Sequence, residues 1–80
     1  MIGMWTEFRK LQKNGINHIY EFENDYGFIG KFKLNESNLD FELLEYSDTY
    51  SERDLEELKY YATKKIVENN FPESVMIAYG

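Results

Sequence analysis

"INHIYEFENDYGFIGKFKLNESNLDFELLEY", residues 16–46, is the stretch that decides the fold. Apolar and charged residues alternate through three segments of it, residues 16–23, 28–34 and 39–46. Such alternation is typical of strands that bury one face. Turn-forming residues separate the segments at positions 24–27 and 35–38. The stretch therefore predicts an antiparallel meander of three strands.

The first turn sets the pairing of the first two strands. Gly27 suits the left-handed position of a three-residue hairpin loop, which glycine occupies at little steric cost. This loop places Tyr20 opposite Phe32 and Glu21 opposite Lys31. Opposite charges that face each other across strands stabilise a sheet by roughly 0.2–1 kcal/mol per pair.

The second turn, residues 35–38, sets the pairing of the next two strands. We expect it to place Leu34 opposite Leu39 and Lys33 opposite Asp40. A slip of one residue in either hairpin would turn charged side chains toward the core.

In this register one face of the sheet is apolar and the other is charged. The apolar face holds Tyr20, Phe22, Phe28, Phe32, Leu34, Leu39, Phe41 and Leu43. The charged face holds Glu21, Lys31, Lys33, Asp40 and Glu42. Gly30 falls opposite Phe22, and its missing side chain leaves space for that ring.

One long C-terminal helix is predicted to cover the apolar face. Ser51 and Asp54 form a shortened capping box at its start. Its apolar stripe consists of Leu55, Leu58, Ala62 and Ile66. Pro72 disfavours helical geometry at the preceding residue and marks the stop. Residues 74–79 then form a short final strand, either parallel beside the 16–23 strand or beside the 39–46 strand.

The first fifteen residues allow two interpretations. Trp5, Phe8 and Leu11 recur every three residues and favour a short helix, with Gly15 as its C-terminal cap. A strand over residues 4–13 is the alternative. The predicted fold is therefore a two-layer α+β domain over residues 1–80, in the order α-β-β-β-α-β.

Composition narrows the classes of partner. The chain has 80 residues, no cysteine and a net charge of −6, which disfavours nucleic acids and anionic membranes as partners. The α-β-β-β-α order resembles that of double-stranded-RNA-binding domains, which meet phosphates with a basic helix start. Here the helix opens with Glu52, Asp54 and Glu56, so we expect no nucleic-acid binding. With no secretory signal or long apolar run, we expect a soluble cytoplasmic protein.

No residue pattern predicts catalysis, a metal or a cofactor. His18 is the one histidine, and we expect it to be structural because no motif places a serine, carboxylate or lysine beside it. Glu21, Glu23 and Asp25 lack the spacing of a calcium loop. The protein is accordingly predicted not to be an enzyme.

Three features favour recognition of another protein. Tyr60 and Val67 fall on the helix side away from its apolar stripe, where they form a contact patch unless Ile2, Met4 and Trp5 fold over them. A second apolar group falls on the charged face of the sheet, either under the N-terminal helix or under another chain: Ile29, Leu44 and Tyr46. Acidic residues gather near the helix start, where they complement its dipole or meet a basic partner: Asp48, Glu52, Asp54, Glu56 and Glu57.

These observations favour a small acidic protein-interaction module, acting as a regulator, inhibitor or immunity-type protein. Its predicted partner-binding residues are Tyr60, Val67, Glu56 and Glu57. The protein partner is unknown. The alternative is a structural domain that forms a homodimer or larger homo-oligomer through its sheet edge.

Overall fold

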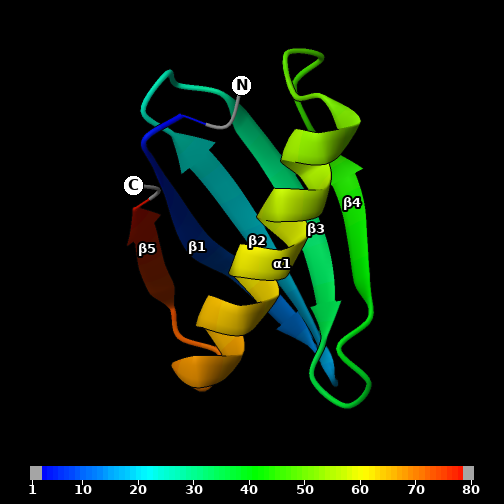
Figure 1. Ribbon diagram of the computed structural model, residues 1–80. Coiled ribbons are helices and arrows are strands. Elements are labelled where there is room, and N and C mark those ends of the chain that lie inside the picture. The colour runs from blue at the N-terminus through cyan, green and yellow to red at the C-terminus, as the bar shows by residue number, and fades with distance from the viewer. Residues whose placement is uncertain (1–2, 79–80) are drawn as a thin grey trace.

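The computed structural model describes residues 3–78 and contains a five-stranded antiparallel sheet with a helix against one face (Figure 1). The elements are β1 (Trp5–Asn14), β2 (Asn17–Asn24), β3 (Ile29–Asn35), β4 (Phe41–Glu45), α1 (Glu52–Glu68) and β5 (Ser74–Ala78). The strands lie in the order β4-β3-β2-β1-β5. The α+β class and the meander are confirmed. The helix has 17 residues and lies between β4 and β5, so it is not strictly C-terminal.

The favoured N-terminal helix is wrong, and the alternative, a strand, is confirmed, because this segment forms β1. A two-residue turn of Gly15 and Ile16 joins β1 to β2, and Gly15 has φ of 62°. Glycine in the first position of a two-residue turn is typical of a type II′ hairpin. A left-handed glycine suits a helix cap equally well. The residue type at position 15 therefore does not distinguish a helix that ends there from a hairpin that turns there. With four strands before the helix, the likeness to double-stranded-RNA-binding domains also falls.

Both positions predicted for the final strand are wrong. β5 pairs antiparallel with β1, with Phe8 opposite Val75 and Thr6 opposite Ile77. The prediction left β1 out of the sheet, and β1 provides the edge to which β5 adds. Tyr79, the predicted end of this strand, lies outside the described residues.

The predicted pairing of β2 with β3 is confirmed. Tyr20 lies opposite Phe32 and Glu21 opposite Lys31. The role given to Gly30 is confirmed as well. A Cβ atom at this position would overlap the ring of Phe22 and lie 2.5 Å from the carbonyl oxygen of Glu45.

The predicted pairing of β3 with β4 is wrong by two residues. Leu34 lies opposite Phe41 and Lys33 opposite Glu42. The turn is longer than predicted because Leu39 takes a left-handed conformation, with φ of 62°, and the Asn35 side chain accepts hydrogen bonds from the turn backbone. A shift of two residues keeps Phe41, Glu42 and Leu43 on their predicted faces. Leu39 itself leaves the core and is 41% exposed.

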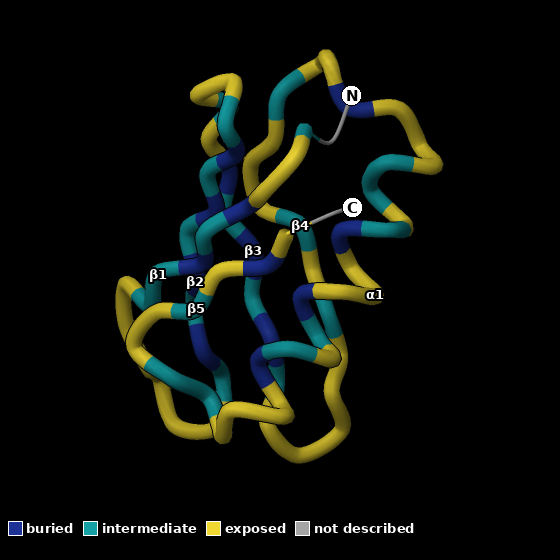
Figure 2. Tube along the Cα trace, turned by 60° about the vertical axis from the view of Figure 1, so that its left-hand side comes forward, coloured by how far each residue is buried: buried dark blue, intermediate teal, exposed yellow. Residues whose placement is uncertain are grey.

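The core is a cluster of aromatic rings between the sheet and α1. Phe32 lies at its centre, with ring centroids 5.9 Å from Phe8, 5.6 Å from Tyr20, 6.0 Å from Phe22 and 4.5 Å from Phe41. Figure 2 shows the buried residues along the strands and on the side of α1 that faces them. Rings of this size bury much area per residue, which suits so short a chain.

The helix start and its apolar stripe are confirmed. The Ser51 side chain accepts from the Asp54 backbone N–H at 3.1 Å, and an Asp54 carboxylate oxygen accepts from the Ser51 N–H at 3.0 Å. Three stripe residues are fully buried and the first packs against the core from a partly buried position: Leu58, Ala62, Ile66 and Leu55. The stripe therefore fixes which side of α1 points to solvent.

Candidate functional site

The side of α1 that points away from the sheet carries the predicted contact residues. Tyr60 is 59% exposed and Val67 40% exposed. At 100° per residue, Tyr60 lies almost directly opposite the midpoint between Leu58 and Ala62. We call this side, with Glu56, Tyr60, Lys64 and Val67, the outer face of α1.

The N-terminal segment does not shield the outer face of α1. Trp5 belongs to β1, on the sheet face that α1 leaves uncovered, and Met4 is 70% exposed. Ile2, the third residue considered as a cover, lies outside the described residues. The exposure of Tyr60 and Val67 is thus a property of the fold described by residues 3–78.

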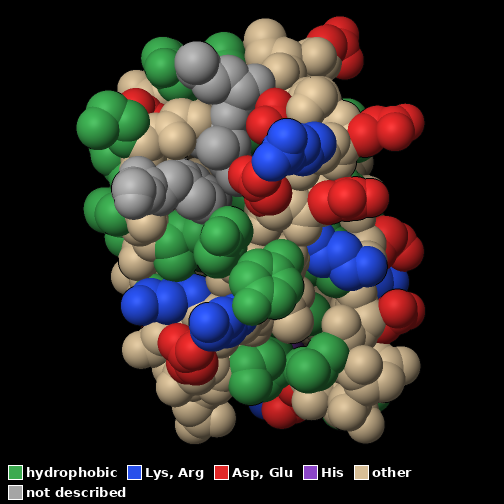
Figure 3. Space-filling view, viewed as in Figure 1, with side chains coloured by type: hydrophobic (Ala, Val, Ile, Leu, Met, Phe, Trp, Pro, Cys, Tyr) green, Lys and Arg blue, Asp and Glu red, His purple; other side chains and the backbone are tan. Residues whose placement is uncertain are grey.

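The charges on α1 are graded along its length. Glu56 is exposed, and Glu57 lies 3.4 Å from Arg53 in an i,i+4 ion pair. The lysines follow, with Lys59 just before the middle of the helix and Lys64 and Lys65 in its second half. Figure 3 looks onto this side of the molecule and shows acidic side chains gathered near the upper end, where α1 begins. Charges so arranged complement the helix dipole.

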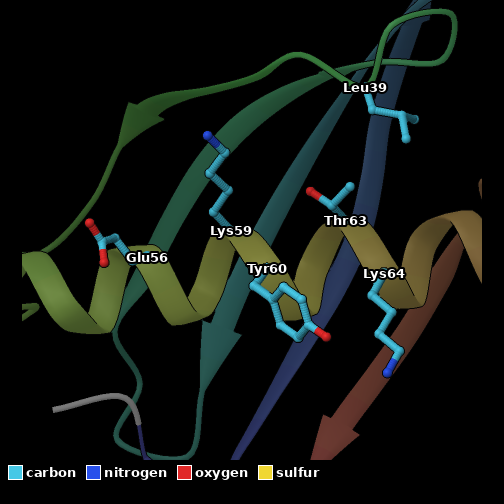
Figure 4. A pocket seen from close by; sticks show the side chains of 6 residues that line it. All are labelled: Leu39, Glu56, Lys59, Tyr60, Thr63 and Lys64. Carbon is cyan, nitrogen blue, oxygen red and sulfur yellow. The ribbon is translucent and has the colours of Figure 1, made fainter.

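A groove of about 530 Å³ lies between α1 and the β3–β4 turn. Its walls are formed by Leu39, Glu56, Lys59, Tyr60, Thr63 and Lys64, which Figure 4 shows in close-up. Two of the predicted residues, Glu56 and Tyr60, line it, whereas Glu57 and Val67 do not. The Thr63 hydroxyl is buried without a hydrogen bond in residues 3–78.

Sequence reasoning missed four of the residues that line the groove. Leu39 was assigned to the core because its left-handed backbone is not visible in an alternating pattern. Lys64 could have been found, since it follows Tyr60 by one helical turn, as Glu56 precedes it. Lys59 and Thr63 line the groove because the β3–β4 turn lies beside them, and this long-range contact cannot be predicted from their own positions in the helix.

The uncovered face of the sheet carries the second predicted apolar group, now with an ion network beside it. Ile29 is 50%, Leu44 45% and Tyr46 51% exposed, so the predicted cover by an N-terminal helix is wrong. The predicted register paired Ile29 directly with Leu44. This pairing is absent, because the β3–β4 register is shifted by two residues and is irregular beside Lys31.

Arg9 is the centre of that network. Its guanidinium donates to Glu7 at 2.6 Å, to Glu21 at 3.0 Å and to Glu23 at 3.0 Å. These bonds, with Glu21 first, raise the pKa of Arg9 above its usual range. The three carboxylates therefore share one internal cation, and the group keeps a formal charge of −2.

His18 lies in a structural position. It is 2% exposed and stacks on Phe71 with 4.5 Å between ring centroids. Its Nε2 lies 3.5 Å from Glu36. Burial, followed by the nearby Lys10 charge, lowers the pKa of His18 and keeps the ring neutral. It does not line the groove beside Tyr60.

The stack with His18 is one of several contacts that hold the loop between α1 and β5. Asn70 and Phe71 both have positive φ, 56° and 52°. The Lys10 ammonium donates to the Phe71 carbonyl at 2.7 Å, and the Tyr20 hydroxyl donates to the Pro72 carbonyl at 2.7 Å. Burial, with a contribution from the Glu73 charge, raises the pKa of Tyr20 to about 12. The group of Lys10, His18 and Tyr20 is accounted for by the loop that it anchors.

Metal binding and membrane crossing find no support in the described part of the chain. Within the described residues, no three acidic, histidine or cysteine side chains are grouped as a metal site. The helix described by residues 3–78 is too short and too polar to cross a bilayer. No protein-family model, curated protein or solved structure matches the chain.

Proposed function

We propose that this protein is a non-enzymatic protein-interaction module that binds through the outer face of α1. In this proposal it acts as a small acidic regulator, inhibitor or immunity-type protein. Tyr60 and Val67 supply apolar contact, and Glu56 and Glu57 steer the approach of a basic partner surface. The observation that carries the proposal is the exposure of Tyr60, at 59%, directly opposite the buried stripe of its helix.

Several features support contact rather than solvation alone. Tyrosine is a rigid amphipathic side chain and is enriched at interface hot spots. The Tyr60 ring has two neighbours within its own helix, the Tyr61 ring at 5.2 Å in an edge-on geometry and the Lys64 ammonium at 5.9 Å from its centroid, and both restrict its rotation. Ordering a side chain before binding reduces the entropy lost on binding.

A pull-down from native lysate, read by mass spectrometry, tests this proposal. A Tyr60→Ser, Val67→Ser double variant is compared with wild type and with an Ile29→Ser, Leu44→Ser variant, whose residues are similarly exposed on the sheet. Circular dichroism establishes that both variants fold. We expect a partner lost only in the helix variant. A partner lost only in the sheet variant would move the binding surface to the sheet.

Self-association through a sheet edge is the second proposal, and the composition of β5 favours it. Its five residues contain no proline and no charge, the usual protections of an edge strand. On the opposite edge, β4 carries two glutamates and an irregular pairing. A Met76→Lys variant should abolish such an assembly, and a chain that stays monomeric at millimolar concentration would refute it.

A further inference from the structure

We infer that a second copy of this chain fits the outer face of α1, with the two helices antiparallel and Tyr60 at the two-fold axis. The inference rests on the proposed use of this face and names the partner. A two-fold interface places the same surface on both sides, so the surface must be complementary to itself.

The charges around Tyr60 meet that requirement. Glu56 lies four residues before Tyr60 and Lys64 four residues after it, on the same side of the helix. In an antiparallel pair centred on Tyr60, Glu56 of each copy faces Lys64 of the other. Within residues 3–78 neither side chain has an ion pair of its own. Each dimer would therefore gain two equivalent ion pairs.

Apolar contacts lie between the two ion pairs and on their outer sides. The two Tyr60 rings meet at the axis, where aromatic pairs are favourable beyond the area they bury. The same antiparallel register places Val67 opposite the stem of Arg53, which is long enough to pack along an aliphatic side chain. The groove beside Tyr60 lies at the border of this contact, where the exposed Leu39 adds apolar surface.

Charge distinguishes this interface from pairing at the sheet edges. The groove beside β5 is lined by two lysines and a glutamate, Lys64, Lys65 and Glu68, and β5 itself has no charged residue that could be matched across a two-fold axis. The β4 edge carries Glu42 and Glu45, whose charges are already paired with Lys33 and Lys31 of the same chain. A single helix face is a small interface, and we expect weak, concentration-dependent dimerisation.

Charge reversal provides the test, measured by sedimentation equilibrium up to millimolar concentration. Glu56→Lys and Lys64→Glu alone each turn two attractive pairs into repulsive ones, and we expect the dissociation constant to rise about tenfold. An equimolar mixture of the two single variants restores both pairs in a heterodimer. The Glu56→Lys, Lys64→Glu double variant restores them in a homodimer. Both single variants remain net negative, so recovery in the mixture requires local pairing.

Three outcomes would overturn the inference. The first is a mixture of single variants that associates no better than either alone. The second is a Met76→Lys control that abolishes association while Glu56→Lys leaves it intact, which would place the interface at β5. The third is a wild-type chain that stays monomeric throughout. If that monomer still captures another protein, and the Tyr60→Ser, Val67→Ser variant does not, the proposed function stands and only the second copy is excluded.

Discussion

Replacing Gly30 with alanine tests how β2, β3 and β4 fit together. The added methyl group would overlap the Phe22 ring and lie 2.5 Å from the Glu45 carbonyl oxygen, where an ordinary contact is 3.4–4 Å. The ring can rotate, but the carbonyl belongs to the backbone of the region where β4 ends. The substitution therefore requires β4 to move by about 1 Å or the ring to leave its place in the core.

The expected loss follows from two opposing effects. Overpacking a core costs about 1–3 kcal/mol. Alanine also lowers the conformational entropy of the unfolded chain, which stabilises the folded protein by about 0.4–1 kcal/mol. Because a backbone atom is involved, we expect an overpacking cost of about 3 kcal/mol, near the top of its range. After the opposing gain of about 0.4–1 kcal/mol, Gly30→Ala should lower the free energy of unfolding by about 2 kcal/mol.

Urea unfolding followed by circular dichroism measures this loss. In a Gly30→Ala, Phe22→Leu double variant, the smaller side chain makes room for the methyl group. The losses of unfolding free energy in the single variants Gly30→Ala and Phe22→Leu should then add up to about 1 kcal/mol more than the loss in the double variant. The remaining loss reflects the Glu45 carbonyl. A Gly30→Ala protein as stable as wild type, within about 0.5 kcal/mol, would refute this packing.

Three further predictions concern the helix and the loop that follows it. Ser51→Ala removes the N-cap acceptor and should lower the unfolding free energy by about 1 kcal/mol in urea titration, with Ser51→Thr as the control that keeps most of it. Tyr20→Phe leaves the Pro72 carbonyl without its donor and should lower the unfolding free energy by about 1–2 kcal/mol in the same assay; an unchanged midpoint would contradict the anchoring role. Because the pKa of His18 is lowered in the folded protein, the unfolded chain binds more protons as the pH falls below about 6.5, and stability should decline there until the folded-state pKa is passed. Urea midpoints between pH 7.5 and 5 should fall less in His18→Phe than in wild type, and parallel curves would show that this histidine does not contribute.

Alternation and turn residues were sufficient to predict the centre of the sheet. The β2–β3 register followed from Gly27 because a left-handed glycine permits few hairpin loops. The capping box and the apolar stripe of α1 were equally local and were predicted correctly. These elements are set by neighbours in sequence, which is why a single chain reveals them.

The errors arose where one local pattern fits two structures. Gly15 suits a helix cap or a hairpin turn, and the apolar spacing of β1 mixed residues from both sides of a strand. The alternation of Thr6, Phe8 and Lys10 toward the core becomes evident only once β2 and β5 lie on either side. The β3–β4 register depended on the backbone of Leu39, which residue type does not reveal.

The candidate site was predicted in part, for the same reason. Helical spacing placed Tyr60 and Val67 on one side of α1, and both are exposed. The groove required the β3–β4 turn to lie beside the helix, a long-range contact that no local pattern specifies. Whether Glu56 and Glu57 contact a partner remains a prediction.

Amide chemical shifts recorded at increasing protein concentration test the central claim most directly, because they locate contact residue by residue. The account predicts shifts that grow with concentration and gather around Glu56, Tyr60 and Lys64 on the outer face of α1. They should be absent from a Tyr60→Ser, Val67→Ser variant. Shifts confined to β5, or no shifts up to millimolar concentration, would contradict a self-complementary outer face.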